Sequence, residues 1–512
     1  MKLRALLRGS LLYTLGNFLP RIGAFLLLPL YTVAMAPSEY GVYSLMLSLI
    51  GLLAIVYRLG LDGSLLRFHF DVAPARRPAL YFSATMTTVV VAVTLSIVIA
   101  AIAAPFFPRI FPGVAFWPYG ALALAITATT ALQYVPSSLF RALERPERFL
   151  AFGLGVFALG TVATVIFLFV FERGAGGALA GQLVGGLGVV AVTGVILARM
   201  PRRRFDRQLM RRALRFGLPL LPHGLAAWSL NFSDRWLIGL TIGLPTLATQ
   251  AAVGIYSFGY LIGQGVALVA ISFNAAWVPF WYARGDGERG PRLLREATTL
   301  VMGGLTVLAV GVAAFAPELT RLLATRRWGD EALGAIDVAV IVTFASLVYG
   351  LYFMLVSTIF LRRRTSALPL ITLAAGLTNV AFNLLLIPRL GITGAAWSTL
   401  AGYLVLGAAT WWYGARSYPI AIDIARLATL GTAAVVAVLA ARLIRPEVVG
   451  SWVSGPAHVA IAGGFAVLLL PVLAGPLAQF RQLLAAERIE DRAARAAAAR
   501  TVGTMGDPEE HA

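Results

Sequence analysis

Apolar runs long enough to cross a bilayer recur from one end of the chain to the other, and they limit its possible folds more than any other feature. A hydrocarbon core of about 30 Å needs about 20 apolar residues per helix, because each backbone polar group must be satisfied within the segment. Of the 512 residues, 59% are hydrophobic and only 13% are charged. The sequence therefore predicts an all-α polytopic membrane protein, since barrel strands would instead alternate over about ten residues.

Fourteen transmembrane helices are predicted from these runs. They lie at residues 11–35, 41–61, 79–104, 118–138, 149–171, 175–198, 216–242, 250–283, 296–316, 336–361, 366–387, 393–413, 427–444 and 457–478. The first run continues to Met35 without a small-residue cleavage site, so we expect it to remain as a span rather than to be a signal peptide. The Ala-rich stretch from Pro476 to Arg500 is expected to form a solvated or membrane-surface helix.

The distribution of Lys and Arg predicts the orientation of these spans. With this set of helices, 32 of the 42 Lys and Arg residues fall on one side and 8 on the other. Basic residues concentrate in cytoplasmic loops, so both termini are predicted to be cytoplasmic. The net charge of +19 is explained by topology, and no nucleic-acid partner is predicted. The chain has no Cys, and the predicted outer loops carry no cluster of His, Asp and Glu, so we predict no metal, no cofactor and no enzymatic activity.

Two short motifs recur at nearly the same separation and indicate an internal repeat. Gly41 lies in Tyr40-Gly41-Val42-Tyr43-Ser44 and Gly254 in Val253-Gly254-Ile255-Tyr256-Ser257, while Gly177-Ala178 matches Gly394-Ala395. An even number of spans per half gives parallel repeats about an axis normal to the membrane. The predicted organisation is an N-terminal six-helix lobe at 1–200, a C-terminal six-helix lobe at 201–415, two additional helices at 416–480 and a cytoplasmic tail at 481–512.

Arg21 lies near the middle of the first predicted span and follows Pro20. An unpaired cation at that depth costs at least about 3 kcal/mol, so its side chain should face protein or a water-filled cavity. Two interpretations remain open. Arg21 either binds carbonyl groups that the proline kink leaves free, or it forms an anion clamp in a central cavity, where its planar fork suits phosphate.

Asp234 and Arg235 are a second intramembrane feature, within the predicted span 216–242. Adjacent residues point about 100° apart on a helix, so we expect one to face a cavity and the other a neighbouring helix. An interhelical structural pair and a role in substrate binding or ion coupling are both compatible with the sequence. His223 of the same span can titrate near neutral pH, so it is either a proton-coupling group or a structural histidine.

Arg58, Asp62 and Arg284 lie at the predicted inner ends of spans. Their charged groups can reach the interface along apolar stems, which is the structural interpretation. Alternatively Arg58 and Arg284 line the cavity with Arg21 and Arg235, and Asp62 takes part in coupling.

Four stretches together resemble the polysaccharide-exporting flippases (Wzx-type) of the multidrug/oligosaccharidyl-lipid/polysaccharide exporter superfamily. They are Leu28-Pro29-Leu30-Tyr31 with the Tyr40 to Ser44 motif; Phe216-Gly217-Leu218-Pro219 with Ser233-Asp234-Arg235; the Val253 to Ser257 motif with Pro279; and Asn379, Asn383 and Ile387-Pro388 with Gly391 to Ala396. The resemblance implies two six-helix lobes around a cationic cavity. It also implies transfer of a polyprenyl-diphosphate-linked oligosaccharide from the cytoplasmic to the outer leaflet of a bacterial inner membrane by alternating access.

The same resemblance carries further expectations. The family's cationic cavity is carried over to Arg21, and with less direct correspondence to Arg58, Arg235 and Arg284. A polysaccharide polymerase and chain-length machinery are the protein partners it implies. Two extra C-terminal helices also occur in peptidoglycan-precursor flippases, so that subfamily remains open. A multidrug exporter of the superfamily and a membrane enzyme acting on lipid-linked sugar are the competing functions.

Overall fold

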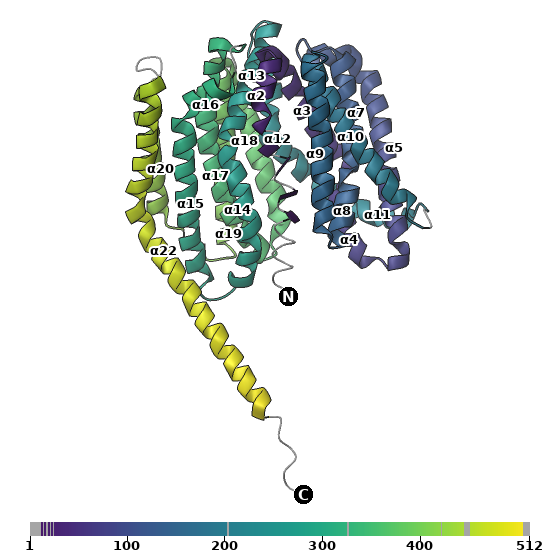
Figure 1. Cartoon of the computed structure of the whole chain (residues 1–512). Coiled ribbons are helices and arrows are strands. Elements are labelled where there is room, and N and C mark those ends of the chain that lie inside the picture. The colour runs from purple at the N-terminus through teal and green to yellow at the C-terminus, as the bar shows by residue number, and fades with distance from the viewer. Residues whose placement is uncertain are drawn as a thin grey trace. The chain divides into compact units, whose positions relative to one another are not determined.

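Figure 1 shows a computed structural model of the chain. The structure describes residues 12–13, 15–16, 19–20, 22–23, 25–201, 204–324, 327–420, 422–444 and 451–504. Every regular element in these residues is helical, which confirms the predicted all-α class.

The first helix with both ends in the described residues begins at Leu28. The helices of the first half of the chain are α2 (Leu28–Ala34), α3 (Pro37–Arg58), α4 (Leu61–Asp71), η1 (Pro74–Arg76), α5 (Arg77–Ala103), η2 (Ala104–Phe106), α6 (Phe107–Ile110), η3 (Phe116–Gly120), α7 (Ala121–Thr130), η4 (Ala131–Gln133), α8 (Tyr134–Ala142), α9 (Pro146–Phe169), α10 (Gly174–Ala198), α11 (Arg207–Gly217), η5 (Leu218–Leu220) and α12 (Leu221–Thr241).

The second half continues with α13. Its helices are α13 (Thr246–Gly263), α14 (Gly265–Arg284), α15 (Gly290–Ala314), α16 (Ala316–Leu323), η6 (Gly329–Gly334), α17 (Ala335–Leu361), η7 (Thr365–Ala367), α18 (Leu368–Leu390), α19 (Ile392–Ala415), α20 (Ile424–Leu443) and α22 (Ser451–Thr504).

Eleven helices of the described chain are long and apolar enough to cross a membrane, and they overlap eleven of the fourteen predicted spans. The predicted span 11–35 falls largely outside the described residues. The span 118–138 is interrupted, because the 3-10 turn η4 separates α7 from α8. The span 216–242 corresponds to η5 and α12, which is not among the eleven. The chain is therefore a multi-pass membrane protein, and the number fourteen remains a prediction.

Two further boundaries differ from the prediction. The predicted span 250–283 consists of two helices, because the chain turns at Gln264 between Gly263 and Gly265, which are poor helix formers. The last predicted span and the Ala-rich stretch after it form a single helix, α22, which continues through Pro456, Pro471 and Pro476.

By their contacts the residues form two compact units. Unit 1 comprises Met1–Ser272, Phe315–Tyr349 and Ser366–Ala409, and unit 2 comprises Phe273–Ala314, Gly350–Thr365 and Thr410–Ala512. In unit 1, α9 packs closely on α10, where a methyl group on Gly181 would lie 2.2 Å from Thr164 Oγ1. In unit 2, α22 packs on α15, where a methyl group on Gly303 would lie 2.5 Å from Leu473. Small residues thus permit the close helix approach that membrane packing requires. The division into two six-helix lobes stays a prediction.

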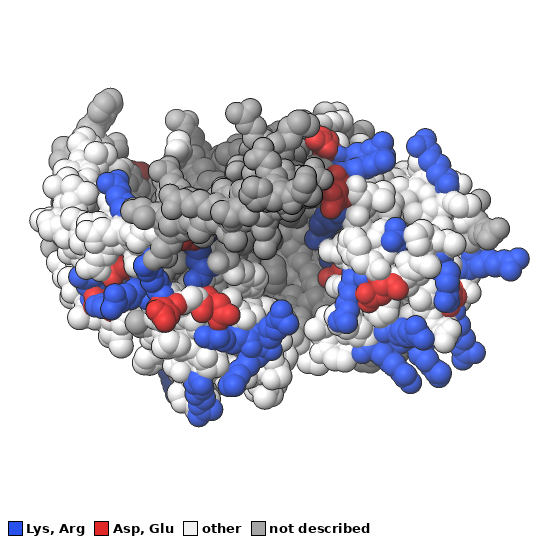
Figure 2. Space-filling model, turned by 90° about the horizontal axis from the view of Figure 1, so that it is seen from below, with Lys and Arg blue, Asp and Glu red and all other residues white. Residues whose placement is uncertain are grey.

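Basic residues gather on one face of unit 1, where α4 and α11 meet. Figure 2 shows Lys and Arg side chains over this region, on the right of the view. Helix α11 buries Leu209 and Met210 in an apolar cluster with α4 and α5 and turns its arginines outward. Asp206 caps α11 by accepting the Leu209 N–H at 3.0 Å, and it pairs with Arg76. The Leu209 N–H, together with the Arg76 guanidinium, holds the pKa of the Asp206 carboxyl below its usual range.

Candidate functional site

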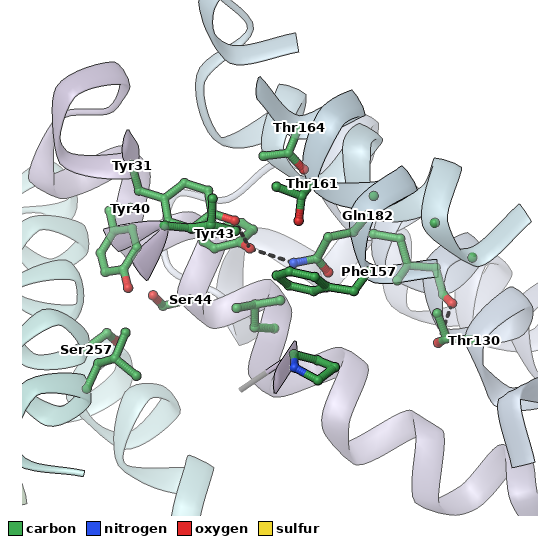
Figure 3. Close-up of a pocket in the computed structure, with 18 of the residues that line it drawn as sticks. Tyr31, Tyr40, Tyr43, Ser44, Thr130, Phe157, Thr161, Thr164, Gln182 and Ser257 are labelled. Atoms are coloured by element: carbon green, nitrogen blue, oxygen red, sulfur yellow. Dashed lines mark hydrogen bonds between the residues drawn. The ribbon is translucent and has the colours of Figure 1, made fainter. Parts of the chain in front are cut away.

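A cavity of 430 Å³ lies within unit 1 between α2, α3, α9 and α10 on one side and α12 and α13 on the other. Figure 3 shows that Tyr31, Tyr40 and Tyr43 form one wall and that Gln182 reaches toward Tyr43 from the opposite side. The ring centroids of Tyr31 and Tyr43 are 5.2 Å apart, and the Gln182 amide donates a hydrogen bond to the Tyr43 hydroxyl at 2.5 Å. The cavity therefore offers flat aromatic faces beside amide and hydroxyl groups.

The start of α3 fixes the tyrosine wall. Ala36 is extended, Pro37 occupies the first helical turn, and the Glu39 carboxylate accepts the Ala36 N–H at 3.0 Å in a capping arrangement. This defined start sets the register of the following turn, so that Tyr40, Tyr43 and Ser44 present their side chains on neighbouring faces of α3.

Arg235 of α12 is the one Lys or Arg among the described residues that line the cavity, and those residues include no Asp or Glu. Its side chain is 8% exposed. The guanidinium donates from Nη1 to the Asn231 carbonyl at 2.8 Å and lies 4.6 Å from the ring centroid of Tyr260 and 5.4 Å from that of Phe232. Cation–π contacts are stronger when desolvated, so these rings hold the cation in place. They leave the positive charge uncompensated by any acid that lines the cavity.

Asp234, the preceding residue, points away from the cavity into the contact of α12 with three other helices. It is fully buried, and it accepts hydrogen bonds from Tyr256 Oη at 2.5 Å, Asn383 Nδ2 at 2.7 Å and Thr399 Oγ1 at 2.9 Å. Within the described chain the carboxylate has no ion-pair partner. The two adjacent charges thus diverge as the helix geometry predicts.

Unpaired polar atoms adjoin the Asp234 carboxylate. Both asparagines are fully buried, and Asn383 Oδ1 and Asn379 Nδ2 have no hydrogen-bond partner in the described chain. A buried acceptor without a partner is costly, and a water, a proton or a cation beside the carboxylate would satisfy it. The one carboxylate at this site can balance a single positive charge. The described residues contain no group of three or more His, Cys, Asp or Glu that could hold a metal ion.

Arg58 and Asp62 lie near the end of α3 and the start of α4. Arg58 Nη2 donates to the Thr130 carbonyl at 3.5 Å, and its Nε is buried without a partner among the described residues. Thr130 itself lines the cavity, but Arg58 is not among the described lining residues. Asp62 is exposed on α4. The structure therefore brings Arg58 to one residue of the cavity wall and leaves Asp62 on the surface.

The remaining predicted residues are distributed elsewhere. His223 Nδ1 lies 2.8 Å from Thr372 Oγ1, which joins α12 to α18 in unit 1. Arg284 belongs to unit 2, where it pairs with Glu487 of α22 at 2.8 Å and lies 4.6 Å from the centroid of Phe280. Arg21 lies outside the described residues. Of the predicted cavity cations that the structure describes, Arg235 alone lines the cavity.

Sequence reasoning missed the tyrosines of the site. A role for Tyr256 and Tyr260 at the site was not predicted, because aromatic residues in an apolar span are usually assigned to the core or to interfacial belts. A signal was nevertheless present in the repeated motif. Its corresponding residues Ser44 and Ser257 both line the cavity, and the corresponding tyrosines are Tyr43 in the cavity wall and Tyr256 beside Asp234.

The fold and the cavity define a class: multi-pass helical membrane proteins with an internal polar and aromatic cavity that carries a buried cation. The chain belongs to the family of polysaccharide biosynthesis proteins, whose model matches residues 6–282, more than half of the sequence. The predicted resemblance to that family is thereby confirmed. No curated protein matches the chain.

Solved structures share the fold. The lipid II flippase MurJ in an inward closed conformation superposes with a TM-score of 0.67 at 13% identity, covering 91% of this chain and 100% of that one. A multidrug resistance MATE family transporter of the MOP superfamily in an inward-facing conformation gives 0.58 at 14% identity, covering 83% and 96%. An outward-facing MATE transporter gives 0.51 at 18% identity, covering 84% and 96%. The MurJ- and MATE-like fold is therefore established, as predicted.

Proposed function

We propose that the protein is a flippase that moves a polyprenyl-diphosphate-linked oligosaccharide from the cytoplasmic to the outer leaflet by alternating access, for surface polysaccharide biosynthesis. The observation that carries this proposal is Arg235, a buried cation that faces a cavity whose described lining includes no acid. An anionic ligand entering the cavity would supply the missing counter-charge. Guanidinium suits a diphosphate because its fork donates two parallel hydrogen bonds.

The charge of the cavity argues against a multidrug exporter. A cationic drug needs an acid within reach, and the one buried acid beside the cavity in the described part of the chain, Asp234, turns its carboxylate toward Tyr256, Asn383 and Thr399 instead. Repulsion from Arg235 in a poorly screened site would further disfavour a cation. A peptidoglycan lipid precursor carries the same diphosphate chemistry, so it is the main alternative substrate, and only a transport measurement with both lipids separates the two.

The cavity wall suits a glycan. Tyr31, Tyr40, Tyr43 and Phe157 offer ring faces that can pack against the C–H faces of a sugar, and the Gln182 amide and neighbouring hydroxyls can exchange hydrogen bonds with its hydroxyl groups. In this proposal the diphosphate binds at Arg235 and the sugar lies against the tyrosine wall. No covalent chemistry is required, in keeping with a transporter rather than an enzyme.

Coupling is assigned to Asp234, with a proton or sodium as the ion. Three hydroxyl or amide groups already surround the carboxylate, and Asn383 Oδ1 offers a further unpaired oxygen. The oxygens of a carboxylate, hydroxyls and an amide are hard ligands that suit such an ion. His223 is bonded to Thr372 and Asp62 is exposed, so neither combines burial with unpaired polar neighbours.

The proposed setting follows from topology. The Arg-rich segments around α4, α8 and α11 would face the cytoplasm of a bacterial inner membrane, with both termini on that side. A polymerase and chain-length machinery would take the flipped substrate at the outer surface.

Reconstitution tests the proposal directly. Purified protein in liposomes should exchange a fluorescent polyprenyl-diphosphate sugar between leaflets faster than protein-free liposomes do, and Arg235→Ala should abolish the difference. A matched lipid that carries a peptidoglycan-type peptide separates the two flippase substrates. If only the peptidyl lipid is exchanged, the substrate is a peptidoglycan precursor rather than a lipid-linked oligosaccharide. Efflux of a cationic dye without lipid exchange would overturn the flippase proposal.

A further inference from the structure

Tyr256 contacts both members of the Asp234–Arg235 pair. Its hydroxyl donates to Asp234 Oδ2 at 2.5 Å, and its ring centroid lies 5.7 Å from the Arg235 guanidinium carbon. Tyr256 is fully buried, so neither contact is shared with bulk solvent. One side chain therefore joins a carboxylate that points away from the cavity to a cation that points into it.

The position of Tyr256 on α13 connects it to a third feature. Gly254, two residues earlier, packs on α3 so closely that a methyl group there would lie 2.0 Å from the Pro37 carbonyl oxygen. Ser257, Tyr260 and Leu261, the following residues of α13, line the cavity. A small rotation or shift of α13 at Tyr256 would therefore alter both the cavity wall and the α3 contact.

We propose that Tyr256 is a positioning residue that transmits occupancy of the Asp234 site to Arg235 and to the cavity-lining face of α13. The inference rests on the coupling site of the proposed function. Asp234 Oδ2 already accepts hydrogen bonds from both Tyr256 and Thr399, so a cation or proton that binds this oxygen must displace or reorient one of these two hydroxyl groups. When the Tyr256 hydroxyl moves, the ring beside Arg235 moves with it.

The neighbouring contacts favour Tyr256 over other residues as the link. Asn383 and Thr399 also donate hydrogen bonds to Asp234, but they lie on α18 and α19, and among the described contacts neither of them touches Arg235. Tyr260 lies over Arg235, yet among the described contacts its hydroxyl has no hydrogen bond to Asp234. Of the described contacts, those of Tyr256 alone reach both charges directly.

The chain has no cysteine, which allows a single labelled site to report on α13. In a Leu261→Cys protein in detergent, the maleimide labelling rate is divided by the rate for a small free thiol at the same pH, because the thiolate is the reacting form. This ratio should change several-fold when sodium replaces potassium or when the pH is lowered. Tyr256→Phe removes the hydroxyl but keeps the ring, so it should fold to wild-type yield and lose most of this change. Tyr57→Phe is the matched control, because Tyr57 is also fully buried and its hydroxyl bonds Ser96 at 2.8 Å away from the site.

A labelling change that persists in Tyr256→Phe would overturn the relay, as would a rate that neither ion affects in the Leu261→Cys protein itself. Loss of the change in Tyr57→Phe as well would also overturn it, since the effect would then reflect any lost buried hydroxyl. Binding of geranyl diphosphate to the same proteins tests the proposed function separately. If Arg235→Ala binds this probe as tightly as wild type, the diphosphate assignment fails, while the labelling result still decides the relay.

Discussion

Gly41 of α3 and Gly254 of α13 pack against each other backbone to backbone. A methyl group on Gly41 would lie 1.8 Å from the Gln250 carbonyl oxygen and 3.0 Å from the Gly254 nitrogen, and one on Gly254 would lie 3.0 Å from the Gly41 nitrogen. These two glycines are the corresponding residues of the repeated motif. The two short motifs that resemble each other in sequence thus contact each other in space through their glycines.

Trp328 also bridges the two helices that meet at this contact, α3 and α13. Trp328 donates from Nε1 to the Met35 carbonyl at 2.9 Å, and its ring packs on Tyr40 of α3 and Phe258 of α13 at centroid distances of 5.7 Å and 5.2 Å. In the predicted topology, this end of α3 lies on the outer side of the membrane. If the cavity opens to that side between α3 and α13, these contacts must separate.

Gly254→Ala should therefore favour the outward-open form or reduce the folded yield. Forcing a methyl group into a closely packed contact typically costs about 1–3 kcal/mol. With Ser44→Cys as a reporter in the cavity, an impermeant maleimide added outside cells should label the variant faster than the parent. Gly194→Ala is the control, because nothing lies within 4 Å of a methyl group there. Equal labelling and equal yield for both alanines would contradict the steric role of the contact.

Arg235→Ala should retain folded yield and lose lipid transport by more than tenfold. Its one described hydrogen bond is to Asn231, one turn back in the same helix, so folding depends on it little, whereas transport needs its charge. Arg235→Lys should keep part of the activity, because a point charge still attracts phosphate without the bidentate geometry. Arg389→Ala is the matched control, because Arg389 is exposed and also donates a hydrogen bond to the carbonyl four residues earlier. This variant should transport normally. A fully active Arg235→Ala would remove Arg235 from substrate binding.

Much of the fold could be predicted from the sequence because membrane spans follow from local composition. Breaks within spans could not, because glycines such as Gly263 and Gly265 are also common inside continuous transmembrane helices, and the 3-10 segment at 131–133 lies within an uninterrupted apolar run. For the site, the divergence of Asp234 and Arg235 follows from the helical period alone. The grouping of Tyr256, Asn383 and Thr399 around one carboxylate depends on which helices become neighbours, and a single sequence does not specify that.

The charged Asp206 carboxylate stabilises the folded protein, so the free energy of unfolding should decrease at acidic pH. Because Leu209 N–H and Arg76 stabilise the charged carboxylate, its pKa is lower in the folded protein than in the unfolded chain. The contribution is therefore present at neutral pH and is lost as the pH falls below the ordinary Asp value, about 4, through the folded pKa. Asp206→Asn keeps an N-cap side chain but loses its charge, so it should lower stability at neutral pH by at most about 1 kcal/mol and flatten the acid limb of a melting-temperature profile. Exposed Asp330→Asn should leave that limb unchanged, and an unaltered profile in Asp206→Asn would contradict the assignment.

Asp234→Asn should abolish the dependence of transport on an ion gradient while leaving the protein folded. The Asn oxygen can still accept from Asn383 Nδ2, and the new amide can donate to the hydroxyl oxygens of Tyr256 and Thr399, because hydroxyl groups can reverse their roles. Asp234→Ala has no such compensation and should reduce thermal stability, since each buried group left unpaired costs about 1–3 kcal/mol.

Lipid exchange measured with and without imposed sodium and proton gradients decides which titratable residue carries the coupling. Wild type and His223→Gln should both respond to the gradient, because His223 bonds Thr372 rather than the carboxylate. Asp234→Asn should exchange lipid at a single, gradient-independent rate, since its site can no longer gain or release a positive charge. Full gradient dependence in Asp234→Asn would exclude Asp234 from coupling, and its loss in His223→Gln alone would transfer the coupling role to His223.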